Sequence, residues 1–181
     1  MRSLSNDWKD SLAKFFRYPV VGEDGSIHLL GVGNPLRGDD AAGIFLVEQL
    51  ARRFRSARLR GIVIHPPVSS PELLISKLIP ARNEILIFDS VEQNAKPGSI
   101  TFRNLDSSRF GFFATHNVPL KLCTGPSGDT KNSFVLGIEP ESLEIGEGLS
   151  ETVQGAVSEI MLELSNLIEQ RIGIARAKRN S

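Results

Sequence analysis

The sequence predicts an α/β protein, a three-layer α/β/α domain with a mostly parallel, twisted sheet of five strands. Short apolar runs, each the length of a strand, alternate along the chain with segments whose apolar residues recur at helical spacing. This alternation is typical of a parallel sheet with helices on both faces. A glycine-rich turn between the first run and the helical segment after it has the strand–turn–helix form of such domains.

The N-terminal segment is the first expected helix. It places Trp8, Leu12, Phe15 and Phe16 at helical spacing, which predicts a short amphipathic helix packed on the body of the domain. A helix that docks on a partner is the alternative.

The remaining elements follow from apolar runs and the residues that bound them. Strands are predicted at 27–30, 61–64, 84–88, 99–102 and 133–138, and the run at 99–102 is the one that could form an antiparallel edge. Helices are predicted at 44–54, 71–78 and 117–122, and from 151 onward. The last helix is the clearest, because Ser150 can cap it and its apolar residues form one stripe: Val153, Val157, Ile160, Leu164, Leu167 and Ile168.

The length of 181 residues suits one domain, which would bury roughly 70% of the surface of its unfolded chain. We expect an N-terminal extension over 1–25, a single α/β domain over 26–172 and a basic tail over 173–181.

Composition excludes several classes of partner. The 21 basic residues balance the 21 acidic ones, so no overall field attracts nucleic acid or anionic lipid. No apolar run approaches the roughly 20 residues that cross a bilayer, and no signal peptide is recognisable. Cys123 is the single cysteine, which excludes an internal disulfide. We therefore expect a soluble, cytoplasmic protein without membrane or nucleic-acid partners.

Charge is nevertheless uneven along the chain. Arginines cluster over 52–60 and glutamates over 139–151, near the end of one predicted helix and the start of another. Complementarity to the helix dipoles explains both clusters, and a polarised docking face is the alternative.

The turn from Gly31 to Gly43 is the most informative segment. A dinucleotide fingerprint would need a third glycine at position 36, which is Leu36, and a P-loop would continue with Lys and Ser or Thr after Gly38. Asp39 and Asp40 stand there instead. Two carboxylates reverse the charge of a phosphate site, so we expect no nucleotide, and the turn suits a cation or an amide.

Three side chains could form a site. Asp40 follows the first strand and Asp89 ends the third, and the carboxyl ends of parallel strands meet at one edge of a sheet. Together with His116 they would suit a divalent transition metal. Each also has a structural reading: Asp39 or Asp40 could cap the first helix after the turn, Asp89 could accept from a loop N–H, and His116 could lie at the surface. His28 and His65 are interpreted as structural. Asn34 is interpreted as fixing the turn, and donation to a substrate carbonyl is the alternative.

No H-E-x-x-H pair or cysteine pair is present to hold zinc permanently. A metal at this site could therefore arrive on something else.

Four motifs, in order, resemble the hydrogenase maturation endopeptidases: G-V-G-N through G-D-D at 31–40, I-F-D at 87–89, T-H-N-V-P-L at 115–120, and G-I-E-P at 137–140 before an apolar helix. The resemblance runs from about Ile27 to Ile172. It implies a cytoplasmic, aspartic-type protease that removes a C-terminal extension from the large-subunit precursor of a [NiFe] hydrogenase after nickel insertion. It also implies that Asp40, Asp89 and His116 approach nickel supplied by the substrate rather than bound permanently.

One departure bears on activity. Similar family members usually have Asp-Gly-Gly after the second strand, where this chain has His65-Pro66-Pro67, and proline restricts that loop. The alternative is thus a non-catalytic accessory that senses nickel in the precursor; an α/β oxidoreductase is a third hypothesis. The residues leave open whether the metal or a carboxylate would activate water.

Overall fold

The computed structural model describes residues 7–17, 25–57, 59, 61–68, 71–78, 83–105, 132–146 and 148–177. The elements run in the order α1 (Asp7–Arg17), β1 (Ile27–Gly31), the 3-10 helix η2 (Gly38–Ala41), α2 (Ala42–Arg53), β2 (Ile62–Ile64), α3 (Pro71–Leu78), β3 (Glu84–Ser90), β4 (Ile100–Asn104), β5 (Ser133–Ile138) and α4 (Glu151–Ala177). The helix predicted at 117–122 lies outside these residues.

The five strands form one sheet in the order β2-β1-β3-β5-β4. The pairs β1–β2, β1–β3 and β3–β5 are parallel, whereas β4 runs antiparallel to β5 at an edge. The predicted fold class is confirmed, and the edge strand takes the antiparallel alternative. Parallel order places the carboxyl ends of β1, β3 and β5 at the same edge of the sheet.

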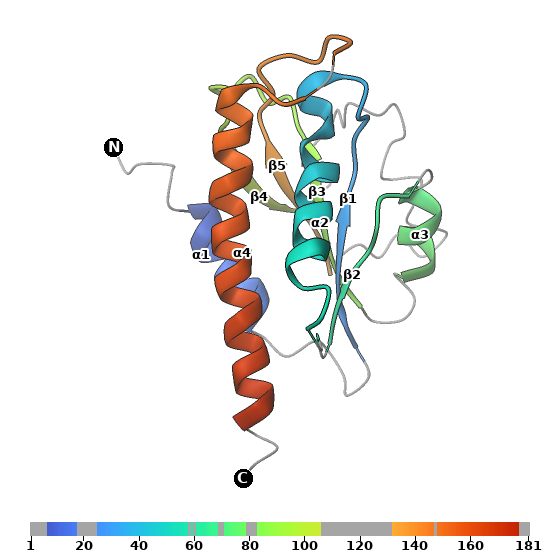
Figure 1. Cartoon of the computed structure of the whole chain (residues 1–181), viewed down its shortest axis with the longest axis vertical. Coiled ribbons are helices and arrows are strands. Elements are labelled where there is room, and N and C mark those ends of the chain that lie inside the picture. Colours follow the sequence, from blue (N-terminus) through green and yellow to red (C-terminus); the bar gives the residue numbers. More distant parts are fainter. Residues whose placement is uncertain are drawn as a thin grey trace.

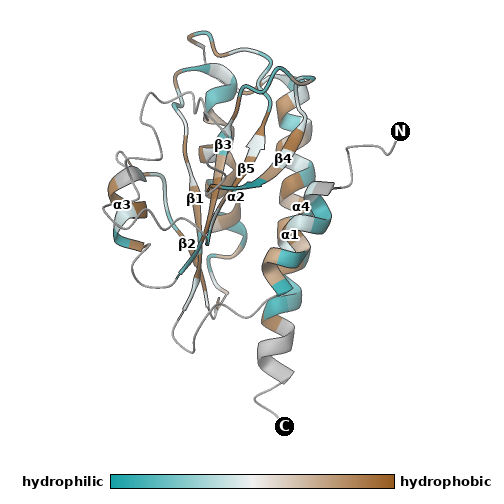
Figure 2. Cartoon of the chain, turned by 180° about the vertical axis from the view of Figure 1, so that it is seen from behind, coloured by the Kyte–Doolittle hydropathy of each residue, from teal (hydrophilic) through white to brown (hydrophobic). Residues whose placement is uncertain are grey.

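Helices cover both faces of this sheet (Figure 1, and from behind in Figure 2). Alternate residues of β3 divide between two clusters, because successive side chains of a strand point to opposite faces. Leu86 and Phe88 belong to the larger cluster, with α1, α2 and α4. Ile85 and Ile87 belong to the smaller one, with Ile75 of α3.

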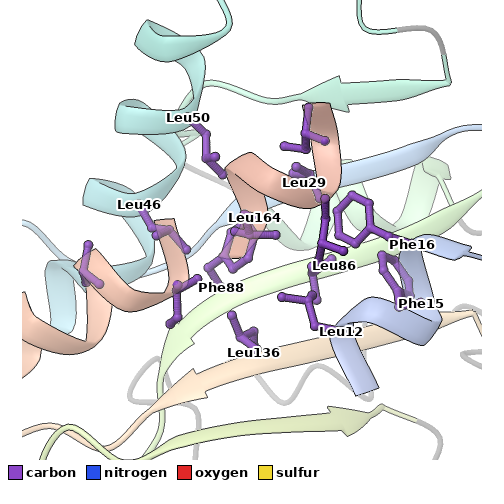
Figure 3. Packing of buried hydrophobic residues seen from close by; sticks show 14 of the residues in the cluster. Leu12, Phe15, Phe16, Leu29, Leu46, Leu50, Leu86, Phe88, Leu136 and Leu164 are labelled. Atoms are coloured by element: carbon purple, nitrogen blue, oxygen red, sulfur yellow. The ribbon is translucent and has the colours of Figure 1, made fainter. Parts of the chain in front are cut away.

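Helix α1 forms where the apolar spacing predicted it. Trp8, Leu12, Phe15 and Phe16 are all buried, and they join side chains of the sheet and of α4 in one cluster (Figure 3). Burial of the apolar stripe favours packing on the body of the domain over a free docking helix.

Helix α4 begins as predicted. The Ser150 hydroxyl accepts a hydrogen bond from the Val153 N–H (3.3 Å), which caps the helix. All six residues of its predicted stripe are buried. Arg52 and Arg53 lie in the last turn of α2 and Glu151 in the first turn of α4, in agreement with the helix-dipole interpretation of the charge clusters. Among the described helices, none combines the length and the apolar character needed to span a bilayer.

Candidate functional site

The turn between β1 and α2 is built by close backbone approach. Gly33 has a φ of 147°, and a Cβ on it would collide with the carbonyl oxygen of Asp40. The Asn34 N–H donates to that same carbonyl (3.2 Å), and the Asn34 Oδ1 accepts from the Leu36 N–H (3.0 Å). Asn34 therefore fixes the turn, as the sequence predicted.

Gly43 brings the start of α2 against the ends of two strands. A Cβ on Gly43 would collide with the carbonyl oxygen of Phe88 in β3 and meet that of Val32 at 2.5 Å. The glycines of this turn thus serve close packing, and they carry the residues just before α2 to the carboxyl ends of β1 and β3.

Asp39 is a structural anchor. Its Oδ2 accepts hydrogen bonds from the N–H groups of Glu141 (2.8 Å) and Ser142 (3.1 Å) and from the Ser150 hydroxyl (3.0 Å). Its Oδ1 accepts from the Ser150 N–H (2.7 Å). The side chain is 1% exposed. It ties the turn to the segment that leads into α4, at the top of Figure 1.

The alternative that Asp39 or Asp40 caps the helix after the turn is wrong for Asp39. The N-cap of α2 is Ala41, without a side-chain cap, and the oxygens of Asp39 bind the start of α4 instead. The hydrogen-bond partners of Asp39 lie about one hundred positions away in the chain, so no local sequence pattern could indicate them.

Asp40 and Asp89 are buried where the two strand ends meet. Asp40 lies in η2 and is 0% exposed; Asp89 is the sixth residue of β3 and is 2% exposed. Burial, followed by the charge of Asp40, raises the pKa of Asp89 to about 8, while a hydrogen bond from the Ser90 N–H (2.8 Å) opposes the shift. The structure thus brings two carboxyl groups, distant in sequence, within electrostatic reach.

The third predicted member of the site, His116, lies outside the described residues, as does Cys123. In the part of the chain that is described, no group of three or more His, Cys, Asp or Glu side chains is arranged to hold a metal ion. Asp40 and Asp89 are two buried carboxyl groups, and metal binding by Asp40, Asp89 and His116 stays a prediction.

His28 and His65 form a pair that was not predicted from the sequence. The His28 Nδ1 lies 2.7 Å from the His65 Nε2, and the rings stack with centroids 5.0 Å apart. Burial lowers the pKa of both imidazoles, and the charge of His65 lowers that of His28 further. The pair joins β1 to the residue after β2, in agreement with the structural interpretation. The register of β1 against β2 places His28 and His65 on one face of the sheet, and this register is known only from the structure.

Glu139, in the fourth sequence motif, fixes the loop that follows Asp89. Its Oε2 accepts from the Gln93 N–H (2.8 Å), and its backbone N–H and carbonyl pair with Ser99 and Gly98. The side chain is buried, and these hydrogen bonds hold the loop in place.

Comparisons with known proteins agree on one family. Residues 45–166 match the family model described as hydrogenase maturation protease. The hydrogenase 3 maturation protease of Escherichia coli K12 is 30% identical over 141 residues, which span 75% of this chain and 86% of the relative.

Solved structures share the fold. A [NiFe] hydrogenase maturation protease from Thermococcus kodakarensis superposes with a TM-score of 0.64 at 19% identity, over 88% of this chain and 99% of that one. The endopeptidase HycI from Escherichia coli has a TM-score of 0.59 at 28% identity, over 76% of this chain and 87% of that one. The matched range 45–166 contains Asp89 and His116, whereas the turn with Asp40 precedes it.

Proposed function

This chain belongs to the hydrogenase maturation protease family, and from that premise we propose that it is an endopeptidase that removes the C-terminal extension of a [NiFe] hydrogenase large-subunit precursor after nickel insertion. The membership makes the protein a protease that serves hydrogenase maturation. The proposal adds three points: the substrate is the large-subunit precursor, its nickel signals that it is ready for cleavage, and the protease is of the aspartic type.

The observation that carries the proposal is the buried pair of Asp40 and Asp89. A carboxyl group with a pKa of about 8 holds its proton at neutral pH. A divalent cation beside it favours the ionised form and would displace that proton. The pair is therefore suited to bind a cation that the substrate brings, and a precursor without nickel gives no compensation for ionising Asp89 beside Asp40.

In this proposal Asp40, Asp89 and His116 bind the nickel of the precursor and hold the scissile amide beside it, which accelerates hydrolysis by proximity. In this proposal the attacking water loses its proton to an ionised carboxylate of the site, which acts as the general base. The protease is then aspartic in type, because acidic side chains replace a serine or cysteine nucleophile.

Incubation with nickel-loaded precursor tests the proposal, with mass spectrometry of the large subunit as the readout. The wild-type protein should shorten the precursor, and Asp40→Asn should leave it at full length while keeping a folded circular dichroism spectrum. Asp10→Asn is the matched control, because Asp10 is an exposed residue of α1, and it should cleave like the wild type.

The same assay separates the non-catalytic alternative. A wild-type protein that binds the nickel-loaded precursor and never shortens it would be an accessory, and the proposal would be wrong. The paired His65 and the prolines after it are the feature that motivates this comparison.

A further inference from the structure

A pocket lies at the end of the sheet opposite Asp40 and Asp89. It is formed by α1 on one side and by the amino ends of β3 and β5 with the carboxyl end of β4 on the other. Its volume is about 480 Å³, within the range of small-molecule sites. Nothing in the proposed proteolysis uses it.

The position of Glu84 in β3 shows that this pocket lies far from the proposed protease site. It is the first residue of β3 and Asp89 the sixth, so about 16 Å of strand lies between them at about 3.3 Å per residue. Five positions apart, the two side chains also point to opposite faces of the sheet. A ligand in the pocket would not touch Asp40 or Asp89.

Glu84 is a buried acidic side chain that lines the pocket, and one of its carboxylate oxygens has no hydrogen-bond partner in the described part of the chain. It is 9% exposed, and within the described residues its Oε2 has neither a hydrogen-bond partner nor an ion pair. Burial raises the pKa of Glu84, and the charge of Arg171 on α4 opposes this shift. The Arg171 Nη1 donates to the carbonyl oxygen of Phe16 (2.7 Å). One oxygen of this pocket-lining carboxyl group therefore lacks a hydrogen bond from the residues described, and a donor that reached it from the pocket would satisfy it.

Aromatic rings form the apolar wall beside Glu84. The centroid of the Phe134 ring lies 5.1 Å from that of Phe15 and 5.3 Å from that of Phe102, in an edge and a stacked arrangement respectively. All three residues line the pocket. Lys14, an exposed residue of α1, also lines the pocket. Water screens the charge of Lys14 more strongly than it screens the charge of a buried group such as Glu84.

We propose that this pocket binds a small organic ammonium ion with an apolar body. The ammonium would donate to the Glu84 carboxylate, and the apolar body would pack on the three phenylalanine rings, which also attract a cation electrostatically. An anionic ligand would place like charge against Glu84 in a poorly solvated site, and a neutral apolar ligand would leave the carboxyl group unsatisfied.

Calorimetric titration of the full chain with 2-phenylethylamine tests this site. 3-Phenylpropanoate is the comparison, because it has a similar body and the opposite charge. The amine should bind and raise the melting temperature, and the acid should bind at least about tenfold more weakly. Glu84→Gln should weaken amine binding by about tenfold or more. Glu92→Gln, at an exposed glutamate, should leave it unchanged.

Lys14→Glu keeps the proposal testable if Glu84→Gln does not fold. Lys14 is exposed, so the variant should fold, and reversing its charge should raise affinity for the amine several-fold. Absence of amine binding, equal binding of amine and acid, or unchanged affinity in Glu84→Gln would each overturn the proposal. Cleavage of the nickel-loaded precursor by Lys14→Glu should equal that of the wild type, so failure of this site is distinguishable from failure of the protease proposal.

Discussion

Asp40 lies within electrostatic reach of Asp89 in the folded chain. Burial and then the charge of Asp40 raise the pKa of Asp89 to about 8, so the folded protein keeps at neutral pH a proton that an unfolded chain would release. Native proteins rarely retain such an arrangement for stability, because buried like charges are costly. The cost is expected at a site that gains a compensating cation when its substrate arrives.

The two neighbouring acids of the turn should respond differently to the same substitution. Asp39→Asn replaces one acceptor oxygen by a donor that faces N–H or O–H groups of Glu141, Ser142 or Ser150. We expect it to lower the free energy of unfolding by about 2 kcal/mol or more, measured by urea denaturation.

Asp40→Asn should abolish cleavage of the nickel-loaded precursor with far less effect on stability. The comparison with Asp39→Asn separates loss of the site from loss of the fold. Full cleavage by Asp40→Asn would remove Asp40 from the site, and a stable, active Asp39→Asn would show that the anchor is unimportant.

Asp89 should make the protein less stable as pH rises. Between pH 4 and 8 the unfolded chain has released the proton of this carboxyl group and the native state retains it, because the native pKa is raised from 3.8 to about 8. The native state then binds more protons, so the free energy of unfolding falls with rising pH across this window.

Asp89→Asn removes that pH dependence. We compare the free energy of unfolding of the variant with that of the wild type by urea denaturation at pH 4 and at pH 8. The difference in favour of the variant should be larger at pH 8 by up to about 5 kcal/mol. The variant should also lose cleavage of the nickel-loaded precursor. An equal stability difference at the two pH values would show that the pKa of Asp89 is not raised.

Helix α1 should contribute to global stability. Leu12 is 0% exposed within the main cluster, so Leu12→Ala should cost about 2–5 kcal/mol in the free energy of unfolding. Lys14→Ala, on the exposed side, should change it by less than about 0.5 kcal/mol. A small loss for Leu12→Ala would mean that α1 docks only weakly, and the helix would become available to a partner.

The fold was predictable because its signals are local. Apolar runs and helical spacing located α3 and β5 at their observed bounds, and the strand at 99–102 was recognised as an edge candidate. Parallel order then determined that residues after β1 and at the end of β3 share one edge, which is why Asp40 and Asp89 could be linked from sequence.

Other features depend on tertiary contacts and were not predictable. Asp39 and Asp40 are identical neighbours in sequence, and only the distant N–H groups around Ser150 distinguish them. The pairing of His28 with His65 needs the strand register. In the sequence Glu84 looks like an ordinary polar residue at the start of a strand. Its burial depends on helix α1, which lines the same pocket over the sheet.

The most direct test of the central claim compares nickel-loaded with nickel-free large-subunit precursor in one cleavage assay. The buried Asp40–Asp89 pair is proposed to require the substrate's cation, so the purified protein should shorten the loaded precursor and leave the nickel-free form intact. Cleavage of both forms at equal rates would contradict the account.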